Sequence, residues 1–203
     1  EDIPENLEFV FVSQYFADEI MNDLDVVVPK SKYSIIHNPI DTDVFSYHKK
    51  PPEQRKKILS IRPFASRKYA NDLTISAIEI LSSKDWFSDL EFLIVGDGEL
   101  FDELTAPLKK YENVTLQKKF LSHTEIAALY KEYGVLLVPT RTDSQGVSRD
   151  EAMSSGLVPI TTAVAAIPEF VDDNCGILAE AEDAHGLAEG IIKLIKDKEL
   201  FST

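Results

Sequence analysis

Two carboxylates and a glycine lie close together in the sequence and could jointly bind a phosphate and a sugar. Asp143 and Glu151 are separated by seven residues, with Gly146 between them. Apolar runs precede and follow this segment, which predicts a strand, a loop, a helix and a strand in that order. The free N–H groups and dipole of a helix start favour an anion, and carboxylates accept hydrogen bonds from hydroxyls. A nucleotide-sugar carries both groups.

Further groups for such a ligand lie nearby and after another predicted strand. The backbone N–H groups of Gly146, Val147 and Ser148 are expected to face the ligand, because glycine permits close approach. Arg62 and Lys68 follow a predicted buried strand. Fixed cations there would stabilise negative charge on a departing phosphate. The alternative for these two residues is a pair of surface cations.

Other turns carry weaker signals. Gly96 and Gly98 end a predicted buried strand, but the chain continues Glu99-Leu100-Phe101 and so lacks the third glycine of a dinucleotide-binding loop. The glycine-rich phosphate loop of NTPases is also absent from the sequence. Three residues after a further strand are expected to frame a nucleotide base: Lys119, Phe120 and Leu121.

The elements that must position these residues alternate between strands and helices. Strands are predicted over 57–62, 90–95, 114–116, 135–139, 158–161 and 176–178, and helices over 71–82, 100–111, 124–133, 168–172 and 185–196. The helix over 100–111 is expected to loosen near Pro107. Apolar strands alternating with amphipathic helices predict an α/β domain with a doubly wound parallel sheet. Ligands of such sheets lie beyond the carboxyl ends of the strands, so the candidate residues should meet in one cleft.

The beginning of the chain is expected to belong to another domain. A strand over 9–13 and a helix over 14–24 precede a turn-rich segment near 38–45. We expect 1–37 to be a remnant or exit segment of a preceding domain with its first strand, 38–56 to be a linker, and 57–203 to be the ligand-binding domain. The last helix has no evident cap, which suggests a truncated piece of a longer protein.

Composition narrows the class of protein. The 203 residues carry a net charge of −14, which argues against nucleic acid and anionic lipid as partners. No apolar run approaches the roughly 18 residues of a membrane span, and the acidic, polar first residues do not form a signal peptide. The single Cys175 excludes an internal disulfide and fits a reducing, cytoplasmic compartment. The four histidines lack metal-ligand spacing, so we expect no metal and no cofactor.

Five segments, in order, resemble a known family. They are His37 to Phe45 ("PNGVD…F"), Ile61-Arg62 with Arg67-Lys68 ("GR…KG"), Ile94 to Glu99 ("VGxGP"), Asp143 to Glu151 ("E-x7-E") and Ala165 to Val171 ("GGxPE"). This ordered set resembles the C-terminal, donor-binding domain of family 4 retaining glycosyltransferases, which have two Rossmann-like domains in the GT-B fold. The similarity extends from about Phe9 to Lys196.

The resemblance implies a function and assigns roles. A nucleoside diphosphate sugar would donate its hexosyl unit, with retention and without a metal, to a glycan, lipid or protein hydroxyl held mainly by the N-terminal domain. Polysaccharide or glycan biosynthesis is the implied setting, either in the cytoplasm or peripherally at the inner face of a membrane, with no anchor in this chain. Glu151 would bind the ribose, Asp143 the sugar, and Arg62 with Lys68 the pyrophosphate. The usual spacing falls on Arg67, and a one-residue insertion would restore Lys68, which the later apolar register favours.

Departures from the family pattern leave two alternative functions open. Asp143 replaces glutamate and is shorter by one methylene, which could mean another hexose geometry, a water-mediated contact or lost activity. Ala165 and Ala166 replace both glycines of "GGxPE". The chain could therefore be a non-catalytic nucleotide- or sugar-binding module. A nucleotide-sugar epimerase of the same architecture, or a dinucleotide oxidoreductase, is the other rival. The sugar, base, acceptor, linkage and oligomeric state stay open.

Overall fold

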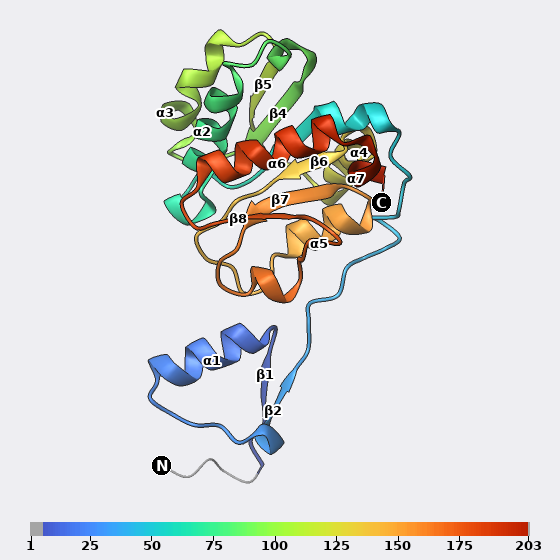
Figure 1. Cartoon of the computed structure of the whole chain (residues 1–203). Coiled ribbons are helices and arrows are strands. Elements are labelled where there is room, and N and C mark those ends of the chain that lie inside the picture. Colours follow the sequence, from blue (N-terminus) through green and yellow to red (C-terminus); the bar gives the residue numbers. More distant parts are fainter. Residues whose placement is uncertain (1–5, 203) are drawn as a thin grey trace.

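The chain forms two separate sheets. A computed structural model describes residues 6–202, so the first five residues of the predicted 1–37 segment and Thr203 lie outside the described part. Near the N-terminus, β1 (Phe9–Phe11) pairs in parallel with β2 (Tyr33–Ile35), and α1 (Gln14–Asp23) connects them. We call these three elements the N-terminal unit. Figure 1 shows this unit beside the main domain, joined to it by an extended segment.

The main domain is built on a six-stranded parallel sheet in the order β5-β4-β3-β6-β7-β8. The strands are β3 (Lys57–Ile61), β4 (Glu91–Gly96), β5 (Val114–Lys118), β6 (Val135–Leu137), β7 (Val158–Thr162) and β8 (Ile177–Ala179). The chain builds outward from β3 in one direction and then returns to β6 on its other side, which is the doubly wound topology. The predicted fold class is confirmed.

Helices cover both faces of this sheet. The helices are α2 (Asn71–Leu81), α3 (Phe101–Thr105), α4 (His123–Glu132), α5 (Val147–Ser154), α6 (Ala184–Lys196) and α7 (Lys198–Ser202). Short 3-10 turns are η1 (Lys30–Lys32), η2 (Pro52–Lys56), η3 (Arg67–Tyr69), η4 (Phe87–Asp89), η5 (Ala106–Lys110) and η6 (Ile167–Glu169). No helix within residues 6–202 is long and apolar enough to cross a membrane.

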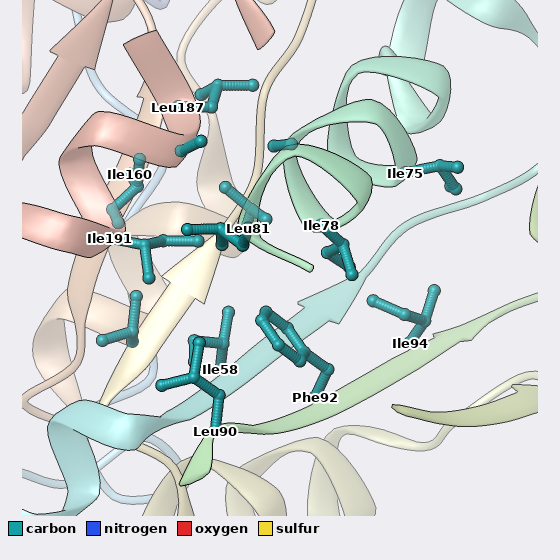
Figure 2. Packing of buried hydrophobic residues seen from close by; sticks show 14 of the residues in the cluster. Ile58, Ile75, Ile78, Leu81, Leu90, Phe92, Ile94, Ile160, Leu187 and Ile191 are labelled. Carbon is teal, nitrogen blue, oxygen red and sulfur yellow. The ribbon is translucent and has the colours of Figure 1, made fainter. Parts of the chain in front are cut away.

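Successive strand residues enter different cores, which explains the nearly continuous apolar runs. Ile58 joins a first cluster with α2, α3 and α6, whereas Leu59 joins a second cluster with α4 and α5. Figure 2 shows the first cluster, in which strand residues meet those of α2 and α6: Ile58, Phe92, Ile94, Ile78, Leu81 and Ile191. Each such fully buried side chain contributes about 1.5–3 kcal/mol.

One predicted helix loosens where its proline was expected to loosen it, and another is shorter than predicted. The predicted helix over 100–111 is an α-helix only to Thr105 and then tightens into η5, because Pro107 has no N–H to donate to the helical ladder. The predicted helix over 168–172 is a single 3-10 turn, η6. Ser122 caps α4 in a capping box with Glu125.

Candidate functional site

A cleft of about 320 Å³ opens beyond the carboxyl ends of β3 and β4. Its lining combines residues from after three strands and from the start of α5: Arg62, Tyr69, Gly96, Lys119, Phe120, Leu121 and Ser148 among others. Parallel pairing aligns these strand ends at the same edge of the sheet, since Ile61 lies opposite Val95 and Val95 opposite Gln117. The cleft is therefore at the position where such sheets bind ligands.

Arg62 places a buried positive charge against this cleft. Its backbone N–H donates to Val95 O (3.1 Å), and its Nη2 donates to Pro139 O (3.2 Å). The residue is 7% exposed, and its buried Nε has no partner among the described residues. Burial lowers the pKa of Arg62, while the negative charge of Asp143 raises it. The guanidinium stays charged at neutral pH, so an anion in the cleft would offset an incompletely compensated cation.

The two cations after Arg62 take different directions. Lys68 Nζ lies 5.0 Å from the centre of the Tyr69 ring, and Arg62 Cζ lies 5.5 Å from the same ring. Since Tyr69 lines the cleft, Lys68 is at its border. Arg67 instead pairs with Asp72 (3.9 Å) and Glu103 (3.5 Å), outside the cleft lining. Neither Lys68 nor Arg67 is in the cleft lining, but Lys68 contacts a residue that is, whereas Arg67 is paired with two acidic side chains.

The start of α5 exposes its first backbone N–H groups. Gly146 is the N-cap residue, with a φ of 91°, and it supplies no side chain to cap them. A Cβ at this position would lie 2.7 Å from Arg149 Nη1. Val147 begins the helix, and Ser148 lines the cleft. A helix start of this kind binds anions.

The two carboxylates precede and follow this helix start in the sequence, Asp143 in the loop and Glu151 in the second turn of α5. Asp143 Oδ1 accepts the N–H of Gln145 (3.2 Å), and its charge acts on Arg62. Glu151 is half-buried, and burial raises its pKa, with His123 lowering it and Asp150 raising it further. Burial also raises the pKa of Tyr130, followed by the charge of Glu151, while Arg62 lowers it. The charges of Glu151 and Arg62 therefore both act on one buried tyrosine.

The glycines after β4 have different roles. Gly96 lines the cleft, and a Cβ there would collide with Arg62 O. Gly98, with a φ of 144°, is packed against the backbone of Phe64 and Ala65, outside the cleft lining. Gly98 thus permits a close backbone approach that a residue with a Cβ would prevent. Within residues 6–202, no group of three or more acidic, histidine or cysteine side chains could hold a metal ion.

A family model described as "Glycosyl transferases group 1" matches residues 55–197, well over half of the chain. The chain belongs to this family. An uncharacterized glycosyltransferase of Methanocaldococcus jannaschii is 27% identical over 206 aligned positions, which cover 97% of this chain and 52% of the relative. N-acetyl-alpha-D-glucosaminyl L-malate synthase of Bacillus anthracis is 28% identical over 190 positions, covering 87% of this chain and 48% of the relative. The chain thus spans about half the length of these relatives.

Solved structures of glycosyltransferases share the fold. A variant of S. aureus TarM, in complex with Fondaparinux, alpha-GlcNAc-glycerol and UDP, superposes with a TM-score of 0.79 at 20% identity, over 96% of this chain and 38% of that one. The six-stranded domain is accordingly the Rossmann-like domain of a GT-B glycosyltransferase, and the resemblance read from the sequence motifs is confirmed.

Two tyrosines that contact residues of this cleft, Tyr69 and Tyr130, were not identified from the sequence. Tyr69 lies beneath both Arg62 and Lys68, and its position directly after the Arg67-Lys68 pair was an available signal. Tyr130 is 1% exposed and donates from its hydroxyl to Ser148 O (3.1 Å), which supports the first turn of α5. It lies on the buried face of α4, where an aromatic residue indicates packing and nothing more.

Proposed function

We propose that this cleft binds a nucleoside diphosphate sugar, with its diphosphate between Arg62 and the start of α5. The observation that carries this proposal is the arrangement of a buried guanidinium and an uncapped helix start around one cleft. Both are anion-binding features, and they come from segments far apart in the sequence. A diphosphate is an anion large enough to contact both.

The neighbouring side chains then take distinct roles. Arg62 and Lys68 neutralise the charge that builds on the departing diphosphate, as a metal ion would in other enzymes. Glu151 accepts hydrogen bonds from ribose hydroxyls, and Asp143 orients the sugar. Phe120 is 87% exposed beside the cleft and, with Lys119 and Leu121, offers an apolar surface for the base.

The whole enzyme is proposed to transfer a hexosyl unit, with retention, to a hydroxyl of a glycan, lipid or protein acceptor. Membership of the glycosyl transferases group 1 family supports the transferase class. Because the chain spans about half the length of its relatives, the acceptor would be held by the rest of the enzyme. The Bacillus anthracis relative is named for an N-acetylglucosaminyl product, and the TarM complex contains UDP. UDP-N-acetylglucosamine is therefore the first donor to test.

A non-catalytic binding module is the second candidate, because Asp143 is shorter than the glutamate that the family places there. Such a module would keep the diphosphate contacts of Arg62 and α5 and lose the orientation of the sugar. It would bind UDP and UDP-sugar equally well. A catalytic enzyme would instead turn over the sugar donor once the rest of the protein is present.

Calorimetric titration of the chain with UDP-, GDP- and ADP-sugars tests the proposed function. We expect one of the three series to bind with a Kd in about the micromolar to millimolar range that substrates usually show. The matching nucleoside monophosphate should bind more weakly, since it lacks the second phosphate. Failure of every nucleoside diphosphate and its sugars to bind would contradict the proposal.

A further inference from the structure

A glutamine in the candidate donor loop (143–146) reaches across to the segment that follows β2. Asn38 N–H donates to Gln145 Oε1 (2.7 Å), and Gln145 Nε2 donates to Asn38 O (3.1 Å). The side chain thus satisfies both backbone groups of one residue, a pairing that needs an amide with a donor and an acceptor. Gln145 is 3% exposed, so water does not readily replace these bonds.

The backbone of the same glutamine is part of the donor loop. Its N–H donates to Asp143 Oδ1 (3.2 Å), and its carbonyl accepts a hydrogen bond from Arg149 Nη2 (2.7 Å). Gln145 Nε2 also donates to Asp150 Oδ2 (3.1 Å). A displacement of Asn38 would therefore be transmitted to Asp143 and to the first turn of α5.

A second contact joins the N-terminal unit to η6, the turn that follows β7. The carboxylate of Glu169, at the end of η6, accepts hydrogen bonds from Gln14 N–H (2.9 Å) and Tyr15 N–H (2.5 Å). These are the first two helical residues of α1, which has no acidic residue in its own first turn. Ser13 Oγ accepts the next N–H, from Phe16 (3.2 Å). Glu169 thus supplies from another part of the chain the negative charge that a helix start favours.

The segment that carries Glu169 is tied to the donor loop as well. Ala166 N–H donates to Asp143 O (3.2 Å) just before η6. The Phe170 ring, which directly follows η6, lies between His37 (5.0 Å between ring centres) and the guanidinium of Arg149 (5.3 Å). The contacts of Gln145 and those of the η6 segment therefore both reach Asp143 and Arg149. These two residues stand three positions before and after Gly146.

We propose that Gln145 and Glu169 form a two-point clasp. Gln145 holds the segment that directly follows β2, and Glu169 holds the start of α1, so the N-terminal unit is fixed against the donor loop and the η6 segment bonded to it. Two contacts that are separated in space set an orientation, which a single contact cannot do. Movement of the N-terminal unit then changes the donor loop, and occupation of the cleft stabilises the clasped arrangement in return. Gln145 and Glu169 are positioning residues in this scheme. The link to donor binding rests on the proposed function, whereas the clasp itself does not.

The orientation is tested by a distance measurement that requires no ligand. Spin labels at Asn22→Cys on α1 and Lys84→Cys after α2, both exposed positions, would be measured by double electron–electron resonance in a Cys175→Ser background. We expect one narrow distance distribution, broadened by Gln145→Ala and by Glu169→Ala. Glu180→Ala, an exposed acid outside both contacts, is the matched control and should change nothing. An unchanged distribution in both clasp variants would overturn the proposal.

Gln145→Glu provides a reversible version of the same test. The charged groups that contact Gln145 are Asp143, Arg149 and Asp150. A carboxylate there would face Asn38 O and Asp150 without a proton to donate, whereas its protonated form keeps a donor. This environment raises the pKa of an introduced carboxyl group. We expect a broader distribution at about pH 8.5 than at about pH 6 in this variant only, and a narrow distribution at both values would count against the clasp.

The coupling to the donor loop has two readouts. Glu169→Ala should speed hydrogen exchange of the amides of residues 143–148, although Glu169 does not touch them, and should weaken UDP binding about fivefold, the effect of losing one or two hydrogen bonds. Unchanged exchange together with UDP affinity within about twofold of the parent chain would refute the coupling. If the parent chain binds no nucleotide, the proposed function is wrong, and distances and exchange alone then decide the clasp.

Discussion

Arg62 and Glu151 show how burial prepares single side chains for a charged ligand. Arg62 is a cation that the fold leaves incompletely compensated, and Glu151 is a carboxylate whose pKa burial raises. The charged form of each side chain is therefore more favourable in contact with its proposed partner, a diphosphate for Arg62 and a ribose for Glu151, than without it. Each should therefore contribute more to binding than to folding.

Substitution of Arg62→Met tests this division. Charged hydrogen bonds to phosphate are worth about 1.5–3 kcal/mol, so UDP affinity should fall by about tenfold to a hundredfold. The melting temperature should change little, because a buried, partly unsatisfied cation is removed. Arg67→Met removes an equal charge from the neighbouring surface and should leave affinity within about twofold. An equal loss in both variants would indicate a general field effect and contradict a specific contact.

Glu151→Gln should separate stability from binding through its dependence on pH. A carboxyl group with a raised pKa in the folded state stabilises the fold fully below its unfolded pKa, and this contribution is lost as pH rises through the folded pKa. The glutamine variant has no such loss, so its melting temperature should gain on the parent chain as pH rises toward neutrality. Its UDP affinity should fall about tenfold with the lost acceptor for ribose. A melting-temperature difference that does not vary with pH would contradict the account.

At the scale of elements, α5 brings together the loop, the helix start and Glu151. Its two ends carry the same backbone feature, since Gly146 precedes the helix with a φ of 91° and Gly156 follows it with a φ of 87°. Only the first of these glycines borders the candidate donor site. A substitution at either glycine therefore introduces the same kind of backbone strain, but only the one at Gly146 does so beside the candidate donor site.

Gly146→Ala and Gly156→Ala should both destabilise the domain. An alanine in this conformation costs about 1–2 kcal/mol, which lowers the melting temperature of a domain of this size by about 2–8 °C. In each case the new Cβ would also lie 2.7 Å from an existing atom, Arg149 Nη1 or His48 O. UDP binding should be lost in Gly146→Ala and kept in Gly156→Ala. Comparable UDP affinities for the two variants would show that the turn at Gly146 does not shape the site.

The elements themselves were largely predictable, and the contacts between them were not. Nearly continuous apolar runs predicted the strands around Ile58, Phe92 and Val135, because both faces of a parallel strand must be buried. Motif spacing likewise pointed to Arg62, Gly146 and Glu151. The direction of Arg67 depends on Asp72 and Glu103, whose proximity follows only from packing of α2 and α3. The burial of Tyr130 and the reach of Gln145 to Asn38 also depend on distant chain segments.

At the scale of the whole molecule, the chain is proposed to bind the donor of the transfer reaction but not its acceptor. Its cleft provides groups for the donor, and it spans about half the length of the relatives it matches. We therefore predict that the isolated chain binds donor but transfers no sugar. The rate at which the isolated chain releases UDP from a UDP-sugar should be no higher than the rate measured for the Arg62→Met variant. Turnover at about 1 s⁻¹ or faster, typical of enzymes, would mean that acceptor groups are already present.

The central claim is that one diphosphate bridges Arg62 and the start of α5. A crystal structure of the chain with the nucleoside diphosphate that binds best in the titrations tests it most directly. We predict that phosphate oxygens lie within hydrogen-bonding distance of the Arg62 guanidinium and of the backbone N–H groups of Val147 and Ser148, with the ribose at Glu151. A nucleotide bound elsewhere on the domain, or in this cleft with its phosphates turned away from Arg62, would contradict the account.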